Sequence, residues 1–496
     1  MFDEGNPVPH LHAVVLAGGS GARFWPLSRE LSPKQMLDIF GGISLITRAV
    51  HRIEPMLETG SLHVLTNERL LDELRNHLIA QDGIEVGDIE FLAEPVPRNT
   101  AAAMALAAAY LMQHDPEALM IVLPSDHLLD DGEVWERTVR LACEAAEGGA
   151  LVTLGLKPKT PETGYGYIRA GRQLPGLTDG DIAVHTADEF VEKPDRETAE
   201  TYLADGRYMW NSGILVACAA TVLSQLRSVG RRRVTPDSTH GELIADTCEW
   251  IAALPAEEWH TGEALERFDA LPAVPFDRAV LEISERVTVV PTDLDWSDVG
   301  SLLALETLAN PDERGNVLVG NVHDVDSTDV ISYSADRLVA TLGLTDTIVV
   351  DTADATLVAA KDRAQDVRAV VDALKAVGAP EVVANRESLR PWGSWTLLMK
   401  GDQFQIKSIS VLSGHRLSLQ SHERRSEHWV VVEGVAQIER DGEVVTVAAN
   451  ESVYIPAGCR HRLGNLGEET LMVIEVAVGE YLGEDDIVRY EDDWGR

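Results

Sequence analysis

Residues 13–35 read AVVLAGGSGARFWPLSRELSPKQ, and this stretch decides what the N-terminal part of the chain is. The apolar run AVVL is typical of a buried strand, and a short turn with Gly18, Gly19 and Gly21 follows it. Glycines let the backbone approach a ligand closely and direct successive N–H groups at an anion. The turn lacks the GxxxxGK[ST] pattern, and Phe24 stands where a dinucleotide fingerprint needs a third glycine. These residues alone support a plain turn and a phosphate cradle about equally.

Two cations after the turn favour the phosphate cradle. Arg23 can donate two hydrogen bonds to phosphate oxygens through its guanidinium, and Lys34 supplies a point charge from a turn fixed by Pro33. The chain has 42 basic and 81 acidic residues, a formal net charge of −39. Such a surface repels nucleic acid and anionic membranes, so we expect neither as a partner. A phosphate ligand therefore needs local cations, backbone amides or a metal.

The composition predicts a cytoplasmic globular protein of several domains. The 496 residues exceed one ordinary core, and no apolar run is long enough to span a membrane. The N-terminus lacks a basic region followed by an apolar one, so we expect no secretory signal. The four cysteines are scattered, which is typical of free thiols in a reducing compartment.

Three regions differ in their hydrophobic patterns. Residues 1–308 alternate apolar runs with helical patterns, which predicts an α/β domain with a mostly parallel sheet and helices on both faces. Residues 309–380 contain short β-like runs and one amphipathic helix; these strands need a partner surface, which favours a homo-oligomer. A polar segment after residue 378 is expected to be a linker. Residues 381–496 carry short strands throughout, as in an all-β sandwich or barrel.

The opening stretch resembles the GGxGxRxxPLSxxxxPK signature of the sugar-phosphate nucleotidyltransferases. Further elements of this family follow in order, and EPVPRNTA is similar to an element of the mannose-1-phosphate guanylyltransferases. The matching elements are EPVPRNTA (94–101), PSDH (124–127), TGYGY (163–167), FVEKP (190–194), WNSG (210–213) and WSDVG (296–300). The resemblance implies a Rossmann-like nucleotidyltransferase domain with a mixed sheet, which transfers GMP from GTP to mannose 1-phosphate.

The resemblance also implies roles for particular residues. The catalytic set is Arg23, Lys34, Asp126, Lys193 and Asp298; Asp126 and Asp298 carry Mg²⁺, a hard cation suited to carboxylate and phosphate oxygens. The nucleotide-binding set is Gly18, Gly19, Gly21, Arg98, Asn99 and Thr100. The sugar-binding set is Gly166, Glu192, Asn211, Asp277 and Glu282. Asn99 and Thr100 are equally good helix N-caps. Where the family usually has a lysine after this last glutamate, the chain has Ile283, so a cation there is in doubt.

The C-terminal region carries a second set of ligand-type residues. Gln420 and His422 lie two apart on an expected strand and so face one side, while Glu427 and His461 follow at the spacing of the two cupin motifs. Two imidazoles, a carboxylate and an amide oxygen suit Zn²⁺ or another divalent metal. A cupin barrel with a metal centre is therefore expected.

This region resembles the type II mannose-6-phosphate isomerase domain through RPWGSW, EHWVVVEG, ESVYIPAG and YLGEDDIVRYEDDWGR. The resemblance implies a bifunctional enzyme that also interconverts mannose 6-phosphate and fructose 6-phosphate. Lys407, Arg416 and Arg462 are candidates for phosphate binding or catalysis. The chain departs from the family at Glu423, Arg424 and Ala477. Two alternatives remain: a guanylyltransferase with a non-catalytic cupin, and a non-catalytic sugar-nucleotide sensor.

Overall fold

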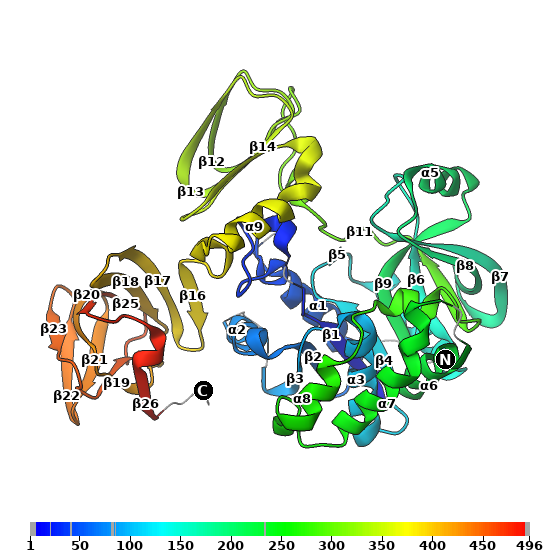
Figure 1. The fold of residues 1–496 in the computed structure, drawn as a ribbon. Coiled ribbons are helices and arrows are strands. Elements are labelled where there is room, and N and C mark those ends of the chain that lie inside the picture. Colours follow the sequence, from blue (N-terminus) through cyan, green and yellow to red (C-terminus); the bar gives the residue numbers. More distant parts are fainter. Residues whose placement is uncertain are drawn as a thin grey trace.

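The structure is a computed structural model that describes residues 6–19, 21–39, 42–80, 84, 86–232 and 235–491. The chain forms an N-terminal α/β body, a small middle sheet and a C-terminal β body (Figure 1). None of the helices in the described segments combines the length and the apolar character needed to cross a bilayer.

The described part of the N-terminal body contains a nine-stranded mixed sheet in the order β3-β2-β1-β4-β9-β6-β10-β8-β7. Its strands are β1 Leu11–Leu16, β2 Leu62–Asn67, β3 Ile89–Glu94, β4 Leu119–Pro124, β6 Leu151–Leu156, β7 Gly166–Asp179, β8 Ile182–Glu192, β9 Tyr208–Cys218 and β10 Val287–Thr292. The sheet is mixed, as the resemblance implies, rather than mostly parallel. β9 inserts between β4 and β6 and runs antiparallel to both, and the strands β8 and β7 add further antiparallel pairs.

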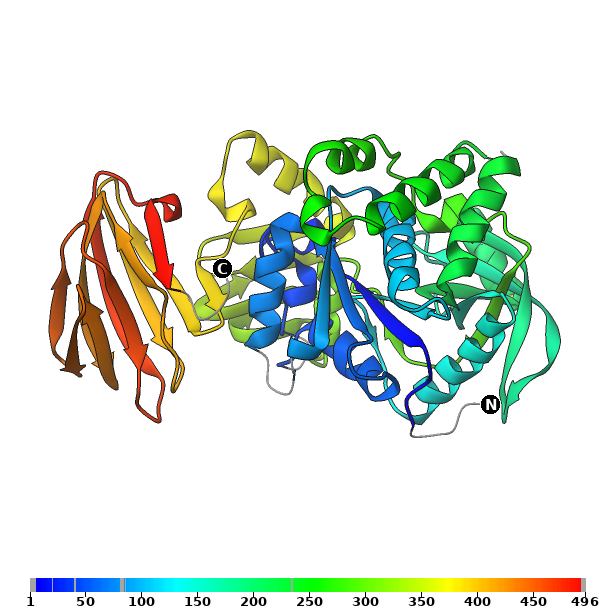
Figure 2. The ribbon, with the colours of Figure 1, turned by 90° about the horizontal axis from the view of Figure 1, so that it is seen from below.

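Helices cover both faces of this sheet (Figure 2). They are α1 Leu45–Ile53, α2 Glu68–Ile79, α3 Asn99–His114, α4 Glu133–Glu147, α5 Arg196–Asp205, α6 Ala219–Arg232, α7 Gly241–Ala252 and α8 Gly262–Asp269. Side chains alternate along β4: Met120 and Val122 pack with α3, α6 and α7, whereas Leu119 and Ile121 pack with α1, α2 and α4. A short ribbon, β5 Leu128–Leu129 with β11 Trp296–Ser297, lies at the carboxyl edge.

The middle sheet packs against residues of the glycine-rich stretch 13–35. It contains β12 Val317–Val325, β13 Ile331–Leu342, β14 Thr347–Asp351 and β15 Thr356–Ala360, followed by α9 Val367–Ala376. Phe24 and Trp25 share one core with Ile331, Ile348 and Val371. The partner surface that these short strands need is therefore present within the same chain.

The segment expected to be a linker is bound along the same stretch. Backbone N–H groups of Glu30 and Leu31 donate to the carbonyls of Val382 and Val383 at 3.1 and 2.8 Å. The indole of Trp25 donates to the Glu381 carbonyl at 3.1 Å. The connection to the C-terminal body is thus fixed by hydrogen bonds to residues more than 300 positions earlier in the chain.

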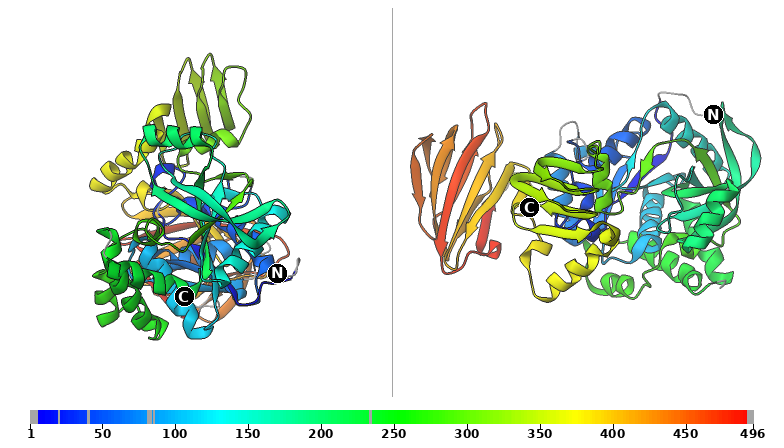
Figure 3. Two further views of the ribbon diagram at one scale, coloured as in Figure 1. Left: turned by 90° about the vertical axis from the view of Figure 1, so that its right-hand side faces the viewer. Right: turned by 90° about the horizontal axis from the view of Figure 1, so that it is seen from above.

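The C-terminal body consists of two antiparallel sheets at one end of the molecule (Figure 3). One sheet contains β16 Glu387–Arg390, β17 Gly393–Lys400, β18 Phe404–Val411, β25 Leu471–Gly479, β20 Arg425–Glu433 and β23 Ser452–Ile455. The other contains β22 Glu443–Ala448, β21 Val435–Arg440, β24 His461–Asn465, β19 Leu419–His422 and β26 Ile487–Glu491. Their inner faces share a core that includes Trp429, Ile438 and Leu463. This is the all-β architecture that the sequence predicts.

Candidate active sites

A cavity of about 500 Å³ opens at the carboxyl edge of the N-terminal sheet. Motifs that are far apart in the sequence meet here, because the turns after β1, β3 and β4 all leave this edge. The cavity is lined by these predicted residues: Gly18, Gly19, Asn99, Thr100, Asp126, Gly166, Glu192, Lys193, Asn211, Asp277 and Asp298. Residues that were predicted from separate motifs therefore line the same cavity.

Lys34 contacts two residues that line this cavity and is bound to three protein oxygens. Its ammonium donates to the carbonyls of Asp298 and Val299 at 2.7 and 2.9 Å. It also pairs with Oδ2 of Asp126 at 2.8 Å, and only 7% of its side chain is exposed. Lys34 was predicted to supply a charge for a phosphate ligand, but in this structure it joins the two loops that carry the candidate metal carboxylates. Gly21 permits this approach, because a Cβ there would lie 2.5 Å from Cβ of Lys34.

The two acidic residues of the candidate Mg²⁺ site have different partners. Burial would raise the pKa of Asp126, but the positive charges of Lys34 and His127 outweigh burial and lower it. Asp298 accepts a hydrogen bond from the Tyr165 hydroxyl at 2.8 Å through Oδ1. Both carboxylates face the cavity, so the pair fits a magnesium ion that also takes phosphate oxygens and water.

The sugar end of the cavity is a hydrogen-bonded group of polar side chains. Asn211 donates to Oδ1 of Asp277 at 3.0 Å and accepts from Thr153 at 2.7 Å. Lys193 pairs with Glu192 at 2.9 Å and remains 56% exposed, so it can exchange this partner for a ligand. Burial, followed by the charge of Glu192, raises the pKa of Asp277 to about 6.

Gly166 and Glu282 fix the position of Glu192 rather than lining the cavity with functional groups of their own. A Cβ at Gly166 would lie 2.7 Å from Oε2 of Glu192, so any larger residue would force this carboxylate to move. Glu282 accepts from the backbone N–H of Glu192 at 3.1 Å. Ile283, at the position of the family lysine, packs against the apolar core and brings no cation to the site.

Two predicted cations lie away from the cavity lining. Arg23 donates to Oε1 of Gln365 in the 3-10 turn before α9, at 2.7 Å. Arg98 pairs with Asp269, and its Nε donates to the Asp269 carbonyl at 3.0 Å. In this arrangement neither arginine lines the cavity, whereas Asn99 and Thr100 do.

Two side chains at this site, one phenol and one carboxylate, were not predicted from the sequence. Tyr165 belongs to the TGYGY element and holds Asp298, and Glu94 ends β3 with its carboxylate beside Gly18. Burial raises the pKa of Glu94 to about 7. Both residues belong to motifs that were recognised in the sequence, but neither residue was given a role there.

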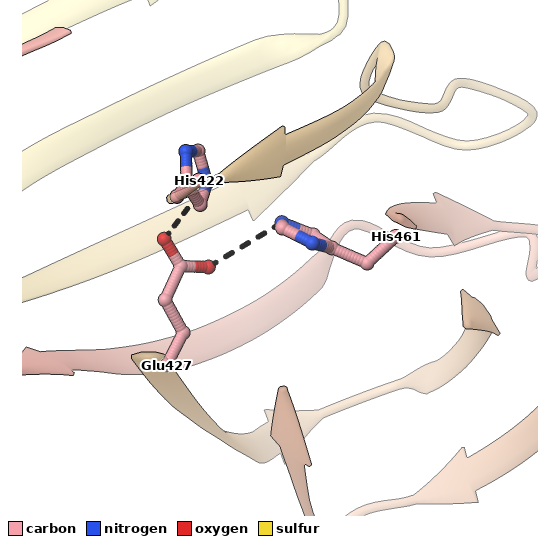
Figure 4. Close-up of side chains that lie close together, drawn as sticks. All are labelled: His422, Glu427 and His461. Carbon is pink, nitrogen blue, oxygen red and sulfur yellow. Dashed lines mark ion pairs between the residues drawn. The ribbon is translucent and has the colours of Figure 1, made fainter. Parts of the chain in front are cut away.

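The second site lies between the two C-terminal sheets. His422, Glu427 and His461 are buried, and their ligand atoms lie within 4.8 Å of one another. Figure 4 shows the two carboxylate oxygens of Glu427 directed at the two rings. Nε2 of His422 is 3.1 Å from Oε1, and Nε2 of His461 is 3.6 Å from Oε2.

The donor chemistry of this cluster fits a divalent metal. Nδ1 of His422 and Nε2 of His461 are buried and have no hydrogen-bond partner among the described residues. Burial opposes ionisation of Glu427, but the hydrogen bond and charge of His422 outweigh it and lower the pKa to about 2. Gln420 pairs in register with His461 across the strands and lines the adjacent pocket. Two imidazoles, one carboxylate and one amide suit zinc or a related ion.

A pocket of about 60 Å³ leads to this cluster. Of the three basic isomerase candidates, Lys407 lines the pocket, with its ammonium 4.2 Å from the Trp395 ring centroid. Arg462 pairs with Glu439 and Glu491 outside the lining. Arg416 also lies outside the lining, and its backbone forms an isolated antiparallel β-bridge with Gly464.

The pocket contains charged residues that the sequence analysis did not assign. Arg425 donates to Oε1 of Glu427 at 3.2 Å. Trp429 donates to both Glu427 and Glu475, at 3.1 and 3.2 Å. Burial, followed by the charge of Glu427, raises the pKa of Glu475 to about 8. Arg390 and Arg489 complete the charged lining.

Three family models match consecutive parts of the chain. Residues 12–314 match a nucleotidyl transferase model, residues 320–374 a mannose-phosphate isomerase/GMP-like beta-helix domain, and residues 378–492 a mannose-6-phosphate isomerase C-terminal model. The model for residues 12–314 alone covers more than half of the 496 residues.

Relatives match the chain over nearly its whole length. The mannose-1-phosphate guanylyltransferase of Escherichia coli K12 is 40% identical over 491 residues, which cover 98% of this chain and 99% of the relative. The alginate biosynthesis protein AlgA of Pseudomonas aeruginosa is 39% identical over 490 residues, 97% of each chain. A crystal structure from Thermus thermophilus, titled a mannose-1-phosphate geranyltransferase, is 32% identical with a TM-score of 0.63, covering 74% of this chain and 99% of that one.

Proposed function

The chain belongs to the family of mannose-1-phosphate guanylyltransferases that carry a C-terminal mannose-6-phosphate isomerase domain, and on this premise we propose that it catalyses both reactions. The N-terminal part, residues 1–308, transfers GMP from GTP to mannose 1-phosphate and releases pyrophosphate. The C-terminal part, residues 381–496, interconverts mannose 6-phosphate and fructose 6-phosphate. Residues 309–380 connect them. Both substrates carry charged phosphates that do not cross membranes unaided, so we assign the reactions to the cytoplasm.

The convergence of separate motifs on one cavity is the observation that carries the transferase proposal. Gly18, Gly19, Asn99 and Thr100 line the end assigned to GTP. The polar group around Glu192, with Lys193, Asn211 and Asp277, is assigned to the mannose phosphate. Asp126 and Asp298 lie where the two substrates would meet, and they would hold Mg²⁺, which neutralises phosphate charge when bound.

In-line transfer accounts for this arrangement. A phosphate oxygen of mannose 1-phosphate attacks the α-phosphorus of GTP, and the bond to the bridging oxygen of the β-phosphate breaks. The products are GDP-mannose and pyrophosphate, so no further reactant is needed. The residues of the chain orient the attacking phosphate and stabilise the charge that develops on the leaving group. Lys193 is suited to the first task because its ammonium is exposed and paired only with Glu192 in the described contacts.

The transferase assay is a pyrophosphate-release measurement with four nucleoside triphosphates and several hexose 1-phosphates in the presence of Mg²⁺. We expect the highest kcat/KM with GTP and mannose 1-phosphate. A preference for UTP or glucose 1-phosphate would refute the assigned specificity. Binding of the nucleotide and the sugar phosphate with no pyrophosphate release would instead support the non-catalytic sugar-nucleotide sensor.

The buried cluster of His422, Glu427 and His461 carries the isomerase proposal. Gln420 is proposed as its fourth ligand. Aldose–ketose interconversion moves a proton between C1 and C2, and a divalent metal at this cluster would polarise the substrate oxygens. The chain itself excludes water from the cluster and holds the carboxylate ionised through its contacts with His422 and Arg425.

A pair of histidine variants tests this assignment. His461→Ala should abolish bound metal, measured by atomic emission, and isomerase activity, while GMP transfer continues. The matched control is His428→Ala, because His428 follows the cluster residue Glu427 on β20 but is exposed, and its ring contacts that of Tyr454. A metal-loaded wild-type protein without isomerase activity would leave the chain as a guanylyltransferase with a non-catalytic cupin domain.

A further inference from the structure

Arg390 connects the isomerase pocket with the transferase domain. It is the last residue of β16, and its side chain lines the isomerase pocket. Its Nη1 also lies 3.4 and 3.2 Å from the two carboxylate oxygens of Glu73. Glu73 belongs to α2 of the N-terminal body, which lies beside β16 (Figure 1). One guanidinium therefore contacts both domains.

The charged lining of the pocket indicates a site for an anion at this rim. Arg425 is engaged with Glu427 and His422 at the metal cluster, and Lys407 lies over the ring of Trp395. Arg390 and Arg489 come from β16 and β26 and line the same pocket. In a chain with a net charge of −39, such a group of cations is suited to a phosphate dianion.

The bonding of Arg390 leaves it able to take a second anion. Its hydrogen bonds to Glu73 and to the Leu389 carbonyl all use Nη1. A guanidinium has further donors on Nη2 and Nε, arranged in a planar fork that matches phosphate oxygens. The Arg390 and Glu73 side chains are 19% and 26% exposed, so water and solutes reach the pair.

The pocket must widen at this rim before a hexose phosphate fits. Its volume is about 60 Å³, whereas ligand pockets for molecules of this class are on the order of 300 Å³ or more. β16 is an edge strand that pairs with β17 alone within the described sheet, so it can shift without breaking an interior ladder. The contact with Glu73 holds this strand against α2.

We propose that Arg390 binds the phosphate group of the hexose phosphate at the isomerase pocket, and that Glu73 of the transferase domain competes with this phosphate for the same guanidinium. Substrate binding and contact between the two domains are then coupled: a phosphate on Arg390 weakens its pairing with Glu73, and the pairing weakens phosphate binding by the same factor. The inference rests on the proposed isomerase function for the identity of the substrate.

The test compares Glu73→Gln with Asp72→Asn in the full chain. Both variants remove one negative charge from α2, but Asp72 is exposed and is not among the residues that hydrogen-bond to Arg390 in the described part of the chain. Titration calorimetry with mannose 6-phosphate should give a Kd about two- to fivefold lower for Glu73→Gln, the range expected for a partly exposed ion pair. Asp72→Asn should match the wild type. Mannose, which lacks the phosphate, should bind all three proteins equally.

Variants of Arg390, alone and combined with Glu73→Gln, complete a double-mutant cycle. Arg390→Gln should raise the Kd for mannose 6-phosphate by about tenfold or more, because a charged hydrogen-bond donor is lost, and Glu73→Gln should have no effect in that background. A Kd for Glu73→Gln equal to or above the wild-type value would overturn the competition. An unchanged Kd for Arg390→Gln would overturn the phosphate assignment.

These binding measurements separate the inference from the proposed function. If the wild type binds mannose 6-phosphate but does not isomerise it, the isomerase proposal fails while the cycle still tests Arg390. If the wild type isomerises the sugar and the variants bind it identically, the inference fails and the isomerase proposal stands.

Discussion

Replacing Lys34 with Met should destabilise the transferase domain even when no ligand is present. The buried ammonium holds Asp126, Asp298 and Val299 through contacts of 2.7 to 2.9 Å. Methionine keeps the length and apolar character of the side chain but supplies no donor, so two carbonyl groups and one carboxylate lose their partner at the same time.

The expected cost follows from burial. Breaking a buried pair by removing one partner costs about 3–5 kcal/mol, because the remaining charge is left uncompensated. The Asp126 side chain is 35% exposed and can recover water, which places the cost near the lower end, about 3 kcal/mol. For a domain of this size that corresponds to a fall in melting temperature of roughly 6 °C.

Differential scanning calorimetry of the ligand-free protein measures this change. The transferase transition is identified as the one that GTP with Mg²⁺ shifts upward. Lys193→Met is the matched control, because the Lys193 side chain is 56% exposed and pairs with one carboxylate, so its transition should stay within about 1–2 °C of the wild type. If Lys34→Met also melts within 1–2 °C of the wild type and only its KM for GTP rises, Lys34 grips phosphate instead of joining the two loops, and the reasoning is refuted.

Three further outcomes are expected. Gly166→Ala should raise the KM for mannose 1-phosphate about tenfold, because the new Cβ would lie 2.7 Å from Oε2 of Glu192 and displace it; an unchanged KM in steady-state assays contradicts this. Glu94→Gln should be more stable than the wild type at pH 8 by up to about 3 kcal/mol, since burial raises the carboxyl pKa to about 7. That advantage should shrink as the pH falls through 7 and vanish near pH 4.5, where folded and unfolded wild type are both protonated; a pH-independent difference in thermal melts argues against it. Arg23→Ala should slow GMP transfer and leave isomerase activity unchanged. If the variant and the wild type transfer GMP at the same rate, the glycine-rich turn has only a structural role.

The pairing of Arg23 with Gln365 adds a control to that last outcome. Gln365→Ala frees Arg23 without removing it. If Arg23 moves to the nucleotide, this variant should keep or raise the transfer rate, measured by pyrophosphate release. A loss equal to that of Arg23→Ala would show that the hydrogen bond itself, and not the guanidinium, supports transfer.

The fold and most of the first site were predictable because their signals are local. Buried strands such as residues 119–124 read as continuous apolar runs, and the loops that follow them reach one edge of the sheet. The sequence pattern predicted a mostly parallel sheet and did not reveal that β9 runs antiparallel to its neighbours. The direction of a strand is set by its pairing partners and cannot be read from the positions of its apolar residues. Gln420 and His422 were predicted as metal ligands from their place in the cupin motif, two positions apart on one strand.

What the sequence by itself determined is which chemical groups the chain brings to each site, since residue type and short spacing select glycines for backbone approach, carboxylates for a hard metal and imidazoles for a softer one. What the tertiary structure decided is which of those groups are engaged with one another. Lys34 with Asp298, Arg23 with Gln365 and Arg390 with Glu73 are contacts across more than 260 positions. Such contacts depend on how distant segments of the chain pack against one another. That packing is set by the burial of many side chains together and cannot be read from a local sequence pattern.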